Sequence, residues 1–88
     1  YYYVRQDLHL ARRVEPKKES LPKELLGRKV IDIKDYDGIK LICDDENWLM
    51  FRGSGTEPIM RTYAEAKSLT QANKLLGVAK EIISKDGV

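Results

Sequence analysis

The chain has 88 residues, and its 16 basic and 14 acidic side chains leave a net charge of +2. This length predicts one small domain, residues 1–88, with a modest core and no deep closed active site. Charge this balanced gives no reason to expect nucleic acid or a membrane surface as a partner. The single cysteine, Cys43, excludes an intrachain disulfide and a cysteine-based metal cluster, and it favours a reducing, cytoplasmic location.

The first ten residues, YYYVRQDLHL, are predicted to form a β-strand, because aromatic and β-branched side chains favour strands. The start at Tyr1 without a methionine suggests a piece of a longer protein, so partners of any site here are expected outside this sequence. His9 is the only histidine. It is predicted to be a surface residue, since no serine, cysteine or carboxylate pattern around it forms a triad or a metal site.

The next segment is charged and is broken by Pro16. A short helix is predicted over residues 20–27, because Ser20 can cap it, Pro22 suits its first turn and Gly27 can end it. This helix would pack three leucines inward: Leu21, Leu25 and Leu26. Four basic residues before it are interpreted as a solvated face, since no aromatic residue lies among them to stack bases: Arg12, Arg13, Lys17 and Lys18.

Three strands are predicted next, over residues 28–35, 38–44 and 48–51, with Asp37-Gly38 as the turn between the first two. Cys43 lies on the apolar face of the second strand and is interpreted as a core residue. The acidic run at residues 44–47 is interpreted as a solvated turn, because it lacks the spaced oxygen ligands of a calcium loop.

A fourth strand is predicted over residues 60–67, and one of its faces carries small and apolar side chains: Met60, Thr62, Ala64 and Ala66. Ser68 and Gln71 then have the spacing of a capping box. From there to about residue 84 the apolar side chains follow helical spacing. The pattern predicts an α+β fold in which an antiparallel sheet packs against helices.

The stretch at residues 52–58, RGSGTEP, lies between two of the predicted strands. Its glycines, its two hydroxyls and the arginines at positions 52 and 61 suit an anion such as a phosphate or a carboxylate. A polar turn explains the same composition equally well. The stretch is no Walker loop and no dinucleotide fingerprint, because it lacks the Gly-Lys-Ser/Thr ending and does not lead into a helix. Ser54 has no histidine near it in sequence, so no catalytic residue is assigned.

The run from Arg52 to Pro58, followed by Arg61 and by Tyr63-Ala64-Glu65-Ala66, closely resembles the phosphate-binding loop of the α-D-phosphohexomutase superfamily. Trp48 and the hairpin at Asp37-Gly38-Ile39-Lys40 also resemble that family. The resemblance covers essentially the whole chain and identifies it with the C-terminal, fourth domain. One departure is the connection from Leu10 to Leu21, which is short for the family's first helix.

The resemblance implies a TATA-binding-protein-like α+β fold, with about four antiparallel strands plus an N-terminal strand and two helices on one face. It implies a parent enzyme that interconverts glucose or mannose 1- and 6-phosphates through a bisphosphate intermediate. The phosphoserine and Mg²⁺ would belong to other domains of the same chain, so this domain would be inactive alone and would bind no metal. The residues that would hold the non-reacting phosphate are Arg52, Gly53, Ser54, Gly55, Thr56 and, as a supporting residue, Arg61.

Within the superfamily, Tyr63-Ala64-Glu65-Ala66 resembles the phosphoglucomutase/phosphomannomutase branch. A phosphoglucosamine mutase domain is the alternative. Outside the superfamily, a non-catalytic RNA-binding module and a purely structural, oligomerising domain stay open. Against RNA, the strand residues beside Tyr63 are not expected to form a stacking pair of aromatic rings. No nucleic-acid or membrane partner is therefore predicted.

Overall fold

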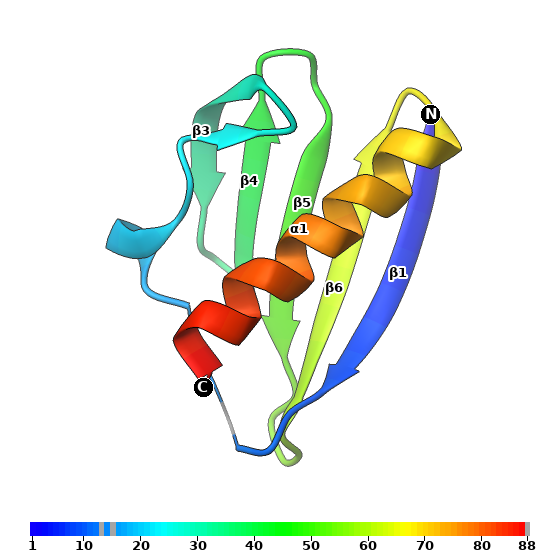
Figure 1. Cartoon of the computed structure of the whole chain (residues 1–88). Coiled ribbons are helices and arrows are strands. Elements are labelled where there is room, and N and C mark those ends of the chain that lie inside the picture. The colour runs from blue at the N-terminus through cyan, green and yellow to red at the C-terminus, as the bar shows by residue number, and fades with distance from the viewer. Residues whose placement is uncertain (13, 15, 88) are drawn as a thin grey trace.

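The computed structural model describes residues 1–12, 14 and 16–87. Six strands form one antiparallel sheet in the order β1-β6-β5-β4-β3-β2, and a single long helix crosses one face of it (Figure 1). In chain order the elements are β1 (Tyr2–His9), the 3₁₀ turn η1 (Lys18–Ser20), β2 (Glu24–Leu25), β3 (Arg28–Lys34), β4 (Ile39–Cys43), β5 (Trp48–Gly53), β6 (Ile59–Ala66) and α1 (Leu69–Gly87). The predicted α+β class is confirmed.

The sheet combines a local meander with one long-range pairing. Strands β3, β4, β5 and β6 follow one another through short connections, as the sequence predicted. Strand β1 instead pairs with β6, with Tyr2 opposite Ala66 and His9 opposite Ile59. In Figure 1 the first strand therefore lies beside the last one, at the right-hand edge of the sheet.

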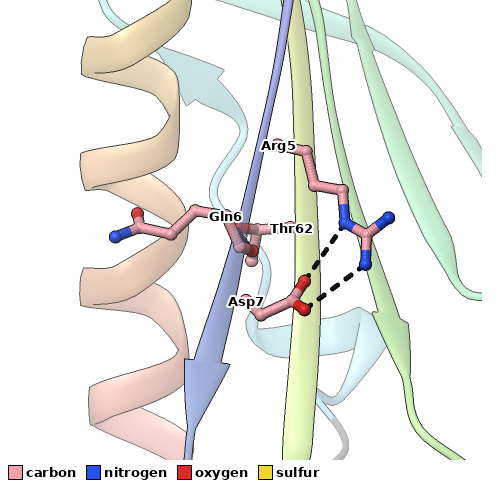
Figure 2. A network of polar contacts seen from close by, with 4 residues as sticks. All are labelled: Arg5, Gln6, Asp7 and Thr62. Carbon is pink, nitrogen blue, oxygen red and sulfur yellow. Dashed lines mark hydrogen bonds and ion pairs between the residues drawn. The ribbon is translucent and has the colours of Figure 1, made fainter.

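The core fills the layer between the sheet and α1. The predicted inner face of β6 is confirmed, because Met60, Thr62, Ala64 and Ala66 are all buried. Small residues there let the helix approach, and the largest side chains fully buried beside them include Phe51, Leu41, Leu49, Leu75 and Ile83. One polar group lies in this layer: the Thr62 hydroxyl donates to the backbone oxygen of Gln6 at 2.7 Å (Figure 2).

The predicted C-terminal helix is confirmed, and its N-terminal cap is formed by Ser68. The hydroxyl oxygen of Ser68 accepts a bond from the Gln71 backbone N–H at 3.1 Å, which satisfies one of the free donors of the first turn. Leu69, predicted to face inward, is 50% exposed, because it lies at the start of the helix, outside the apolar stripe.

The prediction of a helix over residues 20–27 is wrong. The chain forms the turn η1 and then a tight hairpin between β2 and β3, in which Leu25 pairs with Arg28. Leu26 and Gly27 connect the two strands with φ angles of 52° and 81°, the conformation of a two-residue hairpin turn. Leu21 and Leu25 are buried as predicted, but the turn directs Leu26 outward, where it is 45% exposed.

The described residues form a single α-helix, in place of the two helices that were expected. That helix is not long and apolar enough to span a membrane, and the same holds for every helix over the described residues. Of the four basic residues interpreted as a solvated face, Arg12, Lys17 and Lys18 are exposed, and Arg13 lies outside the described residues.

Candidate anion site at the end of the sheet

The loop between β5 and β6 consists of five residues, Ser54–Pro58, held closed by backbone bonds. The Ser54 N–H donates to the Ile59 oxygen at 3.0 Å, and the Ile59 N–H donates to the Glu57 oxygen at 2.8 Å. The N–H of Leu10, just past the end of β1, donates to the Pro58 oxygen at 2.8 Å. The loop is therefore fixed both to its own strands and to the neighbouring edge strand.

Ser54 organises the inside of this loop. Its side chain is buried, and its hydroxyl oxygen accepts bonds from the backbone N–H groups of Thr56 at 3.4 Å and Glu57 at 3.3 Å. Both bonds are long, so both are weak. The hydroxyl proton remains a donor, since these two bonds use only oxygen lone pairs. The backbone donors of the loop thus converge on the Ser54 hydroxyl, and Thr56 itself is exposed.

The two loop glycines leave space around the loop. A Cβ built at Gly53 or Gly55 would meet no other atom within 4 Å, and neither residue has a positive φ. Their small size is therefore not required by backbone strain or by packing. It keeps the loop surface open to an approaching group.

The two arginines lie on the sheet face away from the helix. Arg52 and Arg61 are directly opposite each other in the β5–β6 pairing, so their side chains leave the same face as neighbours. Like charges in such a pair repel each other. The Nε of Arg61 is buried and has no hydrogen-bond partner among the described residues, while a terminal nitrogen of Arg52 lies 3.5 Å from a carboxylate oxygen of Asp37. An anion between the two guanidinium groups would satisfy both.

A hollow of about 340 Å³ opens on the other side of the loop. Its wall comes from two connections that are distant in sequence, the β5–β6 loop and the β3–β4 turn. The lining residues are Pro16, Asp35, Gly38, Ile39, Phe51, Gly53, Ser54, Gly55 and Met60. The predicted site residues thus fall into two groups: Arg52 and Arg61 lie on the open face of the sheet, and Gly53, Ser54 and Gly55 border the hollow.

The open face also carries an aromatic cluster that the sequence analysis missed. The rings of Tyr3 and Tyr63 stack with centroids 6.3 Å apart and planes 21° apart, and Trp48 lies 5.9 Å from Tyr3. The expectation that no stacking pair forms beside Tyr63 is therefore wrong. The pairing of β1 with β6 brings Tyr3 to this position, and only that long-range pairing reveals the cluster.

Cations already cover part of the cluster. The Arg5 guanidinium lies 5.7 Å from the centre of the Tyr63 ring, and the Lys40 amine lies 4.3 Å from the centre of the Trp48 ring. The Trp48 indole N–H donates to Glu65 at 3.1 Å. Among these rings Tyr3 has the largest open surface, at 57% exposed.

His9 is exposed at the end of β1, as predicted. Cys43 is buried, as predicted, and burial together with the carboxylates of Asp45 and Asp44 raises the pKa of its thiol to about 11. A thiol in this state is a poor nucleophile near neutral pH.

The acidic turn between β4 and β5 does not fit a magnesium ion. Asp44 accepts a bond from Arg28 at 2.9 Å, Asp45 from the Asn47 N–H at 3.1 Å, and Glu46 from the Tyr1 hydroxyl at 3.2 Å. Asp45 also lies 3.7 Å from Arg28, so each carboxylate of the turn already has a partner within the chain. Across the part of the chain that the structure describes, no group of three or more His, Cys, Asp or Glu side chains has the geometry to hold a metal ion.

No protein-family model matches the chain. Similar curated proteins include the phosphoglucomutase/phosphomannomutase of Thermococcus kodakarensis, which is 40% identical over 70% of this chain and 13% of that protein. A probable phosphoglucosamine mutase of the same organism is 36% identical over 77% of this chain and 16% of that protein. The phosphoglucosamine/phosphogalactosamine mutase of Sulfurisphaera tokodaii is 34% identical over 94% of this chain and 18% of that protein.

The chain thus spans less than a fifth of the length of these relatives, and what it shares with them is one domain-sized segment. The resemblance seen in the loop sequence and the similarity to these mutases agree. This chain belongs to the α-D-phosphohexomutase superfamily.

Proposed function

We propose that this chain is the C-terminal phosphate-binding domain of a cytoplasmic phosphohexomutase and holds the non-reacting phosphate of a hexose phosphate. The observation that carries the proposal is the Arg52–Arg61 pair beside the β5–β6 loop. Two neighbouring guanidinium groups, one with a buried Nε that lacks a hydrogen-bond partner among the described residues, favour an anion between them. The similarity to sugar-phosphate mutases supports phosphate as that anion.

Different residues around the loop would contribute different interactions with the phosphate. Arg52 and Arg61 supply charge, Ser54 and Thr56 supply hydroxyl donors, and the open surface at Gly53 and Gly55 lets the phosphate approach the backbone. Each charge-assisted bond contributes about 1.5–3 kcal/mol. A few such bonds give dissociation constants on the order of micromolar to millimolar once the ordering costs are subtracted.

The reaction itself would take place on other domains of the parent protein. Mg²⁺ would offset the negative charge of the transferring phosphoryl group there, together with the phosphoserine that the family resemblance implies. This chain's own residues bind and orient the far end of the substrate. In that role the domain is inactive alone, and it acts by positioning the substrate.

For the sugar, we propose glucose or mannose phosphates and the bisphosphate intermediate, with glucosamine phosphate as the alternative. The relatives carry both kinds of name. Glu65, part of the segment that resembles the glucose/mannose branch, accepts the bond from Trp48 on the open face. That bond gives the segment a structural role in addition to any role in distinguishing the branches.

The first test is an NMR titration of the 88-residue chain with inorganic phosphate and with glucose 6-phosphate. We expect chemical-shift changes at Gly53, Gly55 and Thr56. Arg52→Ala should weaken binding about ten- to hundredfold, the loss expected for one or two charge-assisted bonds. Arg28→Ala is the matched control, because Arg28 is also a half-exposed arginine paired with an aspartate, but it lies at the start of β3.

In the parent enzyme, Arg52→Ala and Ser54→Ala should raise KM for the phosphosugar and also lower kcat. The same contacts with the phosphate are needed when the bisphosphate intermediate reorients. Unchanged kinetics in both variants would refute the clamp role. Shifts that spread over the surface and also occur in Arg52→Ala would refute the assignment of the loop.

A second candidate function is binding of single-stranded RNA, and the specific observation in its favour is the Tyr3–Trp48–Tyr63 cluster on the open face. We rank it second because Arg5 and Lys40 already cover two of the rings. A salt titration of binding to a uridine oligonucleotide separates the two. Tight binding with a steep salt dependence that Tyr3→Ala abolishes would favour RNA.

A further inference from the structure

We propose that Asp37, in the β3–β4 turn, is a positioning residue that competes with the bound anion for Arg52 and so limits how tightly the loop grips phosphate. The inference rests on the proposed function and extends it to a residue outside the loop. It starts from one contact: a carboxylate oxygen of Asp37 lies 3.5 Å from a terminal nitrogen of Arg52.

The backbone fixes the turn against the loop. Gly38, the residue after Asp37, has a φ of 89°, and a Cβ at this position would overlap the carbonyl oxygen of Phe51 in β5. The absence of a side chain therefore lets the β3–β4 turn lie directly on β5, one residue before Arg52. Gly38 also lines the same hollow as Gly53 and Ser54, so the turn lies against the end of β5 and the start of the loop.

The side chains of the pair remain mobile enough to exchange partners. The Asp37 side chain is 77% exposed and that of Arg52 is 47% exposed, so solvent screens their attraction and the pair separates at little cost. Over the described residues, no aspartate lies within ion-pair distance of Arg61, although Asp7 is directly opposite it in the β1–β6 pairing. Asp37 thus places one negative charge on the arginine that a phosphate must reach, and the phosphate has to displace that carboxylate to bind Arg52.

This arrangement makes an unusual prediction: removal of the negative charge of Asp37, beside Arg52, should tighten the binding of phosphate. Asp37→Asn keeps the size and hydrogen-bonding capacity of the side chain and removes its charge. We expect the dissociation constant of inorganic phosphate to fall about two- to fivefold, because the phosphate no longer has to displace Asp37 from Arg52 in an exposed ion pair of modest strength. Asp37→Glu, which restores the charge, should bind about as the wild-type chain does.

Two controls separate this effect from a general change in charge or fold. Asp44→Asn makes the same change in net charge and also breaks an aspartate–arginine pair, but at the opposite end of β4, so phosphate affinity should not change. In a chain that already carries Arg52→Gln, Asp37→Asn should lose most of its effect, because the two residues are then no longer coupled.

The same NMR titration decides the outcome. Tighter binding in Asp37→Asn alone, lost in the Arg52→Gln background, supports the proposal. Unchanged or weaker binding in Asp37→Asn, or equal tightening in both backgrounds, overturns it while leaving the proposed phosphate site intact. A wild-type chain that shows no shifts at the loop overturns the proposed function as well, so the two failures are distinguishable.

Discussion

The two faces of the sheet are built from alternate residues of the same strands, yet they differ in chemistry. The face under α1 is apolar and largely shielded from solvent, with Leu41 and Leu49 at 0% exposure. The other face carries charged and aromatic side chains in contact with one another. Figure 2 shows the contrast within three residues of β1: Gln6 extends toward the helix, whereas Arg5 and Asp7 meet on the other side.

The difference separates stability from function. The covered face can supply most of the hydrophobic free energy of folding, because burial of apolar area is the largest favourable term in small domains. The open face contributes weak, screened contacts, and it is free to hold Arg52 and Arg61 side by side. Substitutions on the two faces should therefore have very different effects, and neighbouring residues on one strand provide matched comparisons.

The largest expected effect comes from two adjacent residues of β5. Phe51 is 2% exposed on the covered face, and Met50 is half-buried on the open face. Phe51→Ala should lower the free energy of unfolding by about 3–5 kcal/mol. Met50→Ala should lower it by about 1 kcal/mol. Urea titrations followed by circular dichroism measure both values, and equal losses would contradict the division between the faces.

A smaller effect is expected where a polar group lies within the covered face. Thr62 is fully buried, and its hydroxyl donates to the Gln6 oxygen. Thr62→Val keeps the shape and removes this bond, which should cost about 1 kcal/mol. Thr62→Ser keeps the hydroxyl and is the control for the bond. A Val variant as stable as the wild-type chain would show that the bond contributes nothing.

The covered face should also make stability sensitive to alkaline pH. Burial raises the pKa of Cys43 from 9.0 to about 11, so above pH 9 the unfolded chain gives up this proton before the folded chain does. The contribution of Cys43 is complete below pH 9 and is lost as the pH rises toward 11. Cys43→Ala removes this contribution to the slope. Identical pH profiles for the two proteins would contradict the prediction.

The smallest effect belongs to the open face, at acid pH. The hydrogen bonds from Arg5 hold the pKa of Asp7 below its ordinary value of 3.8. A lowered carboxyl pKa stabilises the fold above the unfolded value, and this contribution is lost as the pH falls through the folded value. NMR titration of the Asp7 carboxyl checks the direction, and Arg5→Gln should return its pKa toward 3.8.

Alternation along the strands was sufficient to predict the residues that β6 buries under the helix and that Cys43 lies in the core, but not the burial of Tyr63 on the opposite face. It could not predict the position of β1, because pairing over sixty residues leaves no local signal in the sequence. The helix predicted over residues 20–27 failed because Gly27 suits both the end of a helix and a hairpin turn, and only the pairing of Leu25 with Arg28 distinguishes them.

The same limits apply to the site. The loop and its two arginines could be identified from their residue types, because glycines, hydroxyls and arginines are the groups that bind anions. The contact between Asp37 and Arg52 could not, since it depends on how closely the β3–β4 turn approaches β5. Side chains that come together through tertiary packing, including Tyr3 and Tyr63, leave no pattern along the chain.

The pairing of β1 with β6 has a consequence for the order in which the domain folds. The first strand of the domain has its partner near the far end of the chain, so it stays unpaired until β6 is available. The meander from β3 to β6 needs only short loop closures, whereas β1 must close the loop of residues 10–58 at a higher entropic cost. Strand β1 carries Tyr3, and Leu10 just after it donates a hydrogen bond to Pro58 in the loop. We therefore expect β1 to pair last, so that the site is completed in the final folding step.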